Sequence, residues 1–223
     1  MHVQSLAAGR AIDRAPAIEI VALAPALSLR GVRMRYTRNE EIFGEGEPAE
    51  HVYRVISGAV RTMRFSQDGR RQILGFYFAG DVFGLEAGAD HALSAEAVCD
   101  AEIAVVRRAH LDKAASSDFA AARAMLDLTA QSLTQARDHA LILGRKGAGE
   151  RVAAFLLRLA DRAPCQELDL AMSRADIADY LALTIETVSR AFTEMERQAA
   201  IALPSSRHVV MRSRAALAEL EAA

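Results

Sequence analysis

Four side chains near the end of the sequence have the types and the spacing needed to contact the edges of DNA bases. Ile185, Glu186, Ser189 and Arg190 follow the spacing i, i+1, i+4, i+5 and therefore lie together on one face of a helix. An arginine can donate two parallel hydrogen bonds to guanine O6 and N7, and a glutamate can accept one from cytosine N4. Ser189 and Ile185 can contact a thymine methyl group. Taken alone, Glu186 and Arg190 would equally suit a surface ion pair worth about 0.2 to 0.5 kcal/mol.

The segment from Met172 to Arg197 predicts the two short helices of a helix-turn-helix. Ser173 is placed to cap the first helix and Thr184 the second, because a side-chain hydroxyl can accept a hydrogen bond from a free amide at a helix N-terminus. Val188 and Phe192 lie opposite the polar face and are expected in the core. A helix buried on one side and polar on the other fits the DNA major groove, which is about 12 Å wide. This setting favours base contact over a simple ion pair.

A short basic hairpin is predicted after the second helix. Ile201 to Leu203 and Val209 to Met211 flank a turn and would form the wing of a winged helix. The net charge is only −2, but residues 197 to 214 contain four arginines and no acidic residue, so any attraction to phosphate is local. The side chains expected to contact phosphate or to position the helices on DNA are Ser173, Arg174, Thr184, Thr187, Thr193, Arg197, Arg207 and His208.

Residues 31 to 110 predict a small antiparallel β domain. Short runs with alternating or β-branched residues, such as His51 to Ile56 and Val60 to Phe65, are separated by turn-forming residues about 8 to 12 positions apart. Asp68-Gly69 is the strongest indication of a hairpin, since glycine readily adopts the positive φ of a tight turn. The expected architecture is a β-roll of the jelly-roll kind.

Residues 1 to 30 differ from this domain in composition. They are rich in alanine and are interrupted by Pro16 and Pro25, which is typical of a chain end without a core of its own. We expect a mobile tail with one short helix near Ile18 to Ala24.

A long helix is predicted from Leu111 to Leu143, a stretch without proline or glycine. Apolar or small residues recur in it at spacings of three and four over more than three heptads, which keeps one stripe facing one partner. The helix could pack on its own β domain, but the stripe is longer than a small barrel can cover, so we expect a parallel homodimer. The predicted contact residues are Phe119, Ala122, Leu126, Thr129, Leu133, Ala136, Ala140 and Leu143.

Glycines separate this helix from the C-terminal part of the chain. Gly144 to Gly149 would interrupt the helix and form a hinge, and this segment lacks the spacing of a phosphate-binding loop. The chain is therefore predicted to be α+β. Its expected parts are a tail at 1–30, an antiparallel β-roll at 31–110, a dimerisation helix and hinge at 111–144, and a winged helix-turn-helix DNA-binding domain at 145–223.

The remaining composition offers little support for other chemistry. No run approaches the ~18 apolar residues of a membrane span, so we expect no membrane partner and a cytoplasmic protein. Cys99 and Cys165 are the only cysteines and are most simply buried thiols, although Cys165 lies in a loop-like stretch and is a candidate redox-sensitive thiol. The six histidines lack the HxH or HExxH spacing of metal sites, so no metal ligand or cofactor is predicted.

The β domain also allows a different class of function, that of a cupin-like metalloenzyme domain joined to a binding module. A cupin site needs a His-x-His pair with a following carboxylate, and no such set occurs between Arg33 and Arg107. We therefore expect no catalytic residue and no enzymatic activity.

With these elements and motifs, the chain resembles the CRP/FNR family of bacterial transcription regulators. The order of β-roll, long helix, hinge and winged helix is the family's order, and its FNR-type recognition helix has the pattern E-x-x-S-R, matched by Glu186, Ser189 and Arg190. The wider text, including MSRADIADYLALTIETVSRAF and VISGAVRTMRFSQDGRRQILGFYFAGDVFGLEAG, is most similar to the FixK branch, whose members serve responses to low oxygen and nitrogen fixation. The resemblance implies a homodimeric activator that binds a palindrome with TTGA-type half-sites and contacts RNA polymerase.

Three features depart from patterns in that family. Oxygen-sensing members hold an iron–sulfur cluster on N-terminal cysteines, and residues 1 to 30 contain no cysteine. Members that bind cyclic AMP clamp its phosphate with an arginine followed by a small hydroxyl residue, where this chain has Leu93-Ser94-Ala95, and leucine cannot pair a phosphate. The turn position that is usually glycine is Ala182, which would strain the turn by about 1 kcal/mol at positive φ. We expect a regulator without cluster or cyclic AMP, and the alternative is one that responds to haem or another small molecule.

Overall fold

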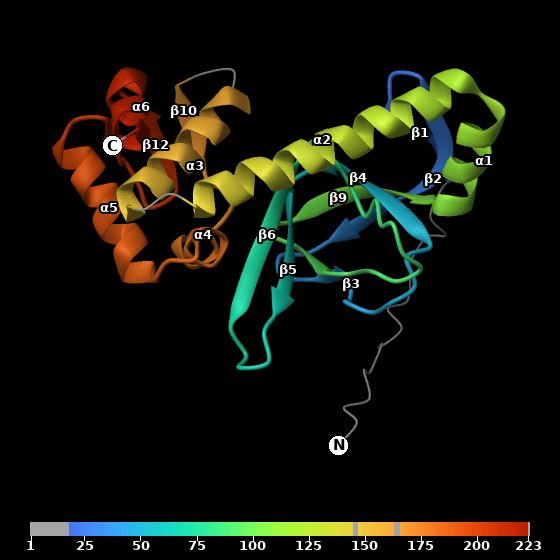
Figure 1. Ribbon diagram of the computed structural model, residues 1–223, viewed down its shortest axis with the longest axis horizontal. Coiled ribbons are helices and arrows are strands. Elements are labelled where there is room, and N and C mark those ends of the chain that lie inside the picture. The colour runs from blue at the N-terminus through green and yellow to red at the C-terminus, as the bar shows by residue number, and fades with distance from the viewer. Residues whose placement is uncertain (1–17, 145–146, 163–165, 223) are drawn as a thin grey trace.

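The first part of the chain forms two antiparallel sheets that enclose one core. The computed structural model describes residues 18–144, 147–162 and 166–222 (Figure 1). The five-stranded sheet has the order β1 (Ile18–Ala24), β2 (Leu27–Tyr36), β9 (Ala101–Arg107), β4 (His51–Ser57) and β7 (Val82–Phe83). The four-stranded sheet has the order β3 (Glu41–Phe43), β8 (Ser94–Ala97), β5 (Ala59–Phe65) and β6 (Arg71–Phe78). This arrangement confirms the predicted β-roll.

The alternation of residues along the strands produces the β-roll core. Val55 and Ile103 from the five-stranded sheet and Val60 and Ala97 from the four-stranded sheet lie buried in one cluster. Successive strand residues point to opposite faces, so these side chains share the inner face. The predicted hairpin at Asp68-Gly69 is confirmed: it joins β5 to β6, and Gly69 has a φ of 80°.

The expected helix near the N-terminus is wrong. Ile18–Ala24 is strand β1, which pairs with β2 in the register Ile18 to Val32. Its β-branched residues favour a strand, and Val21 and Leu23 alternate into the core. The predicted boundary at residue 30 consequently falls inside β2, and the β-roll begins no later than β1. Residues 1 to 17 of the expected tail lie outside the described ranges.

The long helix is interrupted where the sequence predicted it to be continuous. α1 (Arg108–Ser117) and α2 (Phe119–Leu143) are separated by Asp118, whose backbone is extended (φ −138°, ψ 121°). The Asp118 carboxylate accepts a hydrogen bond from the amide of Ala120 at 3.0 Å and so caps α2. An aspartate that caps a helix competes with helical continuation, which explains the break.

Helix α2 extends from the β-roll to the C-terminal domain (Figure 1). Ala121 and Ala124 belong to the same buried cluster as Leu27 of β2, the outer cluster of the β-roll. The interdomain hinge is shorter than predicted, because α3 begins at Ala148 and includes Gly149. The intervening residues 145 and 146 are among those not described.

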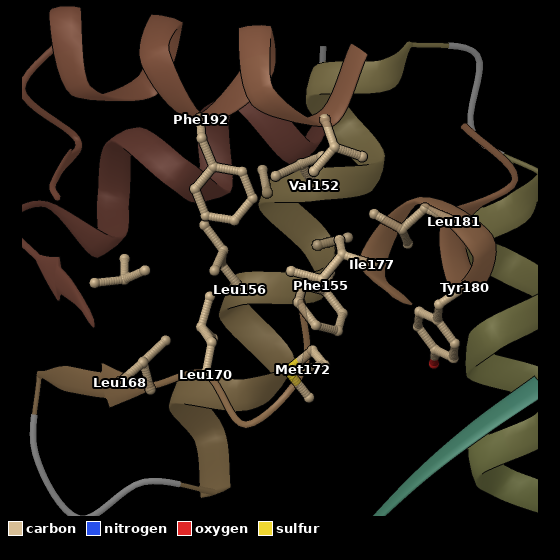
Figure 2. Close-up of a cluster of buried hydrophobic side chains, with 14 of the residues drawn as sticks. Val152, Phe155, Leu156, Leu168, Leu170, Met172, Ile177, Tyr180, Leu181 and Phe192 are labelled. Atoms are coloured by element: carbon tan, nitrogen blue, oxygen red, sulfur yellow. The ribbon is translucent and has the colours of Figure 1, made fainter. Parts of the chain in front are cut away.

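The C-terminal domain is a winged helix built on a hydrophobic core. It contains α3 (Ala148–Arg162), α4 (Arg174–Leu181), α5 (Ile185–Arg197), α6 (Arg214–Ala222) and a sheet with the order β10 (Glu167–Asp169), β12 (His208–Met211) and β11 (Ile201–Ala202). Figure 2 shows side chains from α3, α4 and α5 converging, with Leu156 of α3 below Phe192 of α5 and Ile177 of α4 beside them. None of the helices in the described ranges is long and apolar enough to span a bilayer.

Candidate nucleic-acid interface

Helix α4 begins at the predicted cap. The Ser173 hydroxyl accepts a hydrogen bond from the Asp176 amide at 3.1 Å, and the Asp176 carboxylate accepts one from the Ser173 amide at 2.9 Å. These reciprocal bonds form a capping box, which satisfies two amides that a helix end otherwise leaves free. The start of the helix-turn-helix is therefore fixed locally by its own sequence.

The turn between α4 and α5 contains the predicted left-handed residue. Ala182 has φ 52° and ψ 49°, and its amide donates to the carbonyl of Ala178. The Cβ of an L-residue approaches the following carbonyl in this conformation, at a cost of roughly 1 to 2 kcal/mol. The departure from glycine at this position therefore places backbone strain in the turn that orients α5.

Helix α5 separates its apolar and polar residues as the sequence predicted. The Thr184 hydroxyl caps it by accepting from the Thr187 amide at 3.2 Å. Val188, Phe192 and Met195 are buried against the rest of the domain. The four predicted base-contacting residues, Ile185, Glu186, Ser189 and Arg190, are all exposed, with Ile185 48% exposed.

Two charged residues, Glu186 and Arg190, lie on the exposed face of α5. Within the described residues, Glu186 and Arg190 form no ion pair with each other, and Arg190 has no hydrogen-bond partner. Hydrogen bonds from the backbone amide of Glu186 itself and from Thr184 lower the pKa of the Glu186 carboxyl, and the Arg190 charge adds to this effect. Glu186 is thus held in its ionised form, and its interaction with Arg190 is one of charge without a direct ion pair.

The residues expected to contact phosphate lie in differing environments. Ser173 and Thr184 use their hydroxyls as caps, and Thr193 donates to the carbonyl of Ser189 at 3.1 Å. Arg197 is exposed and paired with Glu194 at 2.6 Å. Thr187, half-buried, lies within 3.0 Å of the Thr184 hydroxyl.

Arg174 packs against the apolar face of α5. Its guanidinium stacks over the ring of Phe192, with its central carbon 3.3 Å from the ring centroid, and its Nη1 is buried without a hydrogen-bond partner among the described residues. Burial lowers the pKa of Arg174 to about 10. The side chain turns toward the apolar face of α5 because its carbon stem and planar group pack well on an aromatic ring. In this conformation it covers the Phe192 ring at the junction of α4 and α5.

The predicted wing is present and carries a basic tip. Strands β11 and β12 pair antiparallel, with Ile201 opposite Met211, and β10 extends the sheet on the other side of β12. Arg207 is exposed at the tip. His208 lies 2.7 Å from Asp169, and its hydrogen bond to that carboxylate raises the pKa of the imidazole.

Helix α2 exposes the stripe predicted to form a dimer. Phe119 is 87% exposed, Leu126 60% and Leu133 49%. Thr129, Ala136 and Ala140 are also exposed, whereas Ala122 and Leu143 are half-buried. This stripe lies on a different side of the helix from Ala121, Ala124, His139 and Ile142, which are buried within the chain. The helix thus covers its own domains with one face and leaves an apolar face free.

The β-roll contains a cavity of about 160 Å³ near the Leu93 segment. Leu93, Phe43 and Tyr77 line it together with the carboxylate-bearing Glu86. His91 is buried beside this cavity, stacked on Phe43 at 3.6 Å, with its Nδ1 3.4 Å from Glu86. The wall offers leucine and a carboxylate where an anion would need cations.

The sequence also contains cysteines and possible metal ligands, and the structure places them as follows. Cys99 is half-buried and packs against the core, and Cys165 lies outside the described residues. Among the residues whose positions are described, no group of three histidine, cysteine or acidic side chains is placed to hold a metal ion. The sequence did not predict the contacts that the β-roll and α2 make with α4, because their partners lie 41 to 115 positions away along the chain.

Comparisons with known proteins agree with this architecture. Residues 33–118 match a cyclic nucleotide-binding domain model and residues 150–220 match a Crp-like helix-turn-helix domain model. The nitrogen fixation regulation protein FixK of Azorhizobium caulinodans is 49% identical over 192 residues, covering 83% of this chain and 77% of that protein. FixK of Rhizobium meliloti is 39% identical over 206 residues, covering 91% and 94%. The structure of FixK2 from Bradyrhizobium japonicum has a TM-score of 0.84 at 48% identity, covering 87% of this chain and 99% of that one.

The fold and the matched models define a transcription regulator with a β-roll and a winged helix-turn-helix, not an enzyme. The chain belongs to the CRP/FNR family, on its FixK-like branch.

The strain at Ala182 can be measured through stability. Ala182→Gly should raise the free energy of unfolding by up to about 1 kcal/mol, because glycine relieves the left-handed strain and loses part of this gain to its greater freedom in the unfolded chain. Ala175→Gly, in the first turn of α4, is the matched control and should lower it, because glycine there relieves no strain and gains freedom in the unfolded chain. Urea unfolding of the three proteins gives both values, and a loss of stability in Ala182→Gly would contradict the strain.

Proposed function

We propose that the chain binds operator DNA as a homodimer and activates genes of the low-oxygen or nitrogen-fixation response. The observation that carries this proposal is α5, whose apolar face is buried while Glu186, Ser189 and Arg190 are exposed together. A capped helix that projects one polar face from a compact domain suits insertion into the major groove. Double-stranded DNA is then the partner, and the cytoplasm is the proposed location.

The chemistry of α5 favours a TTGA-type half-site. Arg190 would donate two hydrogen bonds to guanine, and Glu186 would accept one from the N4 of cytosine on the complementary strand. Ile185 and Ser189 lie beside them and would contact thymine methyl groups. Arg197 and the wing residue Arg207 would contact the backbone, which adds affinity but no sequence preference.

The apolar stripe of α2 supports the homodimer. Phe119, Leu126 and Leu133 are large and exposed, and a monomer would leave them in water. Pairing two α2 helices in parallel buries these residues with the small Ala136 and Ala140, which let the backbones approach closely. A two-fold dimer presents two α5 helices and therefore matches a palindromic site.

The similarity to FixK supports the proposed targets. The relatives named above are nitrogen fixation regulation proteins, and a Rhodopseudomonas palustris relative, 38% identical over 175 residues, is a transcriptional activatory protein. By that similarity we propose activation through contact with RNA polymerase. The wall of the β-roll cavity supports a regulator that takes no cyclic AMP.

Replacement of Arg190 tests the base contact. Arg190→Ala should cost about 1 to 3 kcal/mol on a TTGA-type palindrome and should relax the preference for guanine at its position. Arg197→Ala, on the same helix, is the control and should weaken binding to all duplexes alike, because a phosphate contact carries no sequence information. Fluorescence anisotropy at fixed salt measures both. Equal binding of the wild type to the palindrome and to a scrambled duplex would refute the proposed half-site.

Replacement of Leu133 tests the dimer. Leu133→Glu should convert the protein to a monomer of the 24.1 kDa chain, because dimerisation would bury an unpaired carboxylate. Leu141→Glu is the matched control, since Leu141 is exposed on α2 about a quarter turn away from Leu133 and should leave the dimer intact. Sedimentation velocity distinguishes the masses. A dimer that survives Leu133→Glu would place the interface elsewhere.

Cyclic AMP should have no effect on DNA binding. Its phosphate would meet Leu93 and Glu86, so binding would bury a charge without a cation to pair it. Calorimetric titration with cyclic AMP should give no binding heat, and micromolar cyclic AMP should not change affinity for the palindrome. A reproducible shift in that affinity would show that the β-roll binds the nucleotide in another way.

A further inference from the structure

The last turn of α4 is held by side chains from three other elements. Gln72 of β6 donates to the carbonyl of Asp179 at 2.7 Å, and His139 of α2 donates to the carbonyl of Tyr180 at 2.7 Å. Arg151 of α3 donates to the carbonyl of Leu181 at 3.1 Å. The last carbonyls of a helix have no partner within the helix, so they accept these bonds. The C-terminal end of α4 is thereby tied to the β-roll, the dimer helix and the winged-helix core together (Figure 1).

The side chains of α4 are held by the β5–β6 hairpin as well. Arg71 of β6 bridges two carboxylates, with its Nη2 2.7 Å from Asp176 and its Nε 2.7 Å from Asp179. Arg61 of β5 contacts the same Asp176 oxygen at 3.0 Å. Arg61 is 5% exposed and Asp176 4% exposed, so this ion pair is buried at the boundary between the domains. The ring of His139 adds a parallel stack on Tyr180, with centroids 3.9 Å apart.

Asp176 has two functions at once. Burial alone would raise the pKa of its carboxyl, but hydrogen bonds from Ser173 and the charges of Arg61 and Arg71 outweigh burial and lower the pKa. The same carboxylate therefore caps α4 and accepts both arginines in its ionised form. A change in how α4 lies on the β-roll would leave buried charges unpaired, which is costly.

Directional contacts of this kind fix an orientation. Apolar packing is non-directional, whereas a bridging arginine and hydrogen bonds to individual carbonyls are satisfied in one geometry. Helix α4 packs against α5 through Ile177, Leu181, Val188 and Phe192 of one core cluster, so the orientation of α4 determines that of α5. His139 belongs to α2, the proposed dimer helix, so the orientation is set relative to the two-fold axis.

We propose that Arg71, Gln72 and His139 are positioning residues that set the separation of the two α5 helices in the dimer, and hence the half-site spacing that the protein selects. Two half-sites must lie about one helical turn of DNA apart, roughly 34 Å, for a symmetric dimer to contact both. This inference rests on the proposed function. It adds to the proposed function that residues outside the helix-turn-helix determine which half-site spacing the protein selects.

The experiment measures how affinity depends on the spacing between two half-sites and compares this with affinity for a single half-site. Wild type, Arg71→Gln and Gln72→Leu are titrated against duplexes whose two TTGA-type half-sites differ in spacing by single base pairs, and against a duplex with one half-site. Arg70→Gln is the matched control, because Arg70 is the neighbouring arginine, exposed, and paired with Asp68 in the hairpin turn instead of with α4. Arg71→Lys keeps the charge but a single ammonium cannot bridge two carboxylates in the same way.

Arg71→Gln and Gln72→Leu should bind the single half-site within about twofold of wild type, and lose about tenfold or more on the preferred palindrome, with a flattened spacing profile. Arg71→Lys should recover part of the preference, and Arg70→Gln should behave as wild type. A wild-type spacing profile in both variants would overturn the proposal, as would equal loss on half-site and palindrome. If Arg71→Gln does not fold, Gln72→Leu decides the outcome. Failure of the proposed function would give a different result, because the wild-type protein would then bind no palindrome in preference to other duplexes.

Discussion

The arrangement of the C-terminal domain depends on one packing constraint: α5 buries one of its faces and exposes the other. Val188, Phe192 and Met195 anchor it in the winged-helix core, and burial of each such side chain stabilises the fold by about 1.5 to 3 kcal/mol. The remaining face is then free to carry polar groups without cost to the core. Arg174 strengthens this division, because its guanidinium covers the Phe192 ring instead of pointing outward.

Charge is used in two different ways on the two helices of the motif. Helix α5 keeps Glu186 and Arg190 exposed, and within the described residues they interact through their charges without a direct ion pair. Helix α4 buries Asp176 with Arg61, where the charges are satisfied internally and cannot be moved without a penalty. The net charge of −2 indicates neither arrangement, because each depends on where individual charges lie and not on their sum.

The elements that local residues specify were predictable from the sequence. The caps at Ser173 and Thr184 were identified from residue types that satisfy nearby amides, and the Asp68-Gly69 hairpin from the φ that glycine permits. The secondary-structure predictions were wrong where the same residues suit two different local structures. Ile18–Ala24 contains both alanine and β-branched residues, and pairing with β2 decided in favour of a strand. Asp118 can stand in a helix or cap one, and it caps α2.

Contacts between distant segments could not be predicted from spacing. Arg61 and Arg71 are ordinary strand residues in the sequence, and their partners in α4 lie 115 and 105 positions away. The direction of Arg174 likewise depends on Phe192, which is near it only because the two helices cross. The exposed face of α5 is therefore encoded locally, whereas the orientation of α5 depends on contacts across the whole fold.

The β-roll contacts the C-terminal domain directly. Its inner cavity presents Leu93 and Glu86, which do not suit a phosphate, but its β5–β6 hairpin reaches α4 with Arg61, Arg71 and Gln72. The fold of a cyclic nucleotide-binding domain thus packs directly against the helix-turn-helix domain. The same hairpin supplies a buried charge and backbone contacts to the winged helix. Helix α2 packs against both parts and carries the exposed apolar stripe that is proposed to pair two copies.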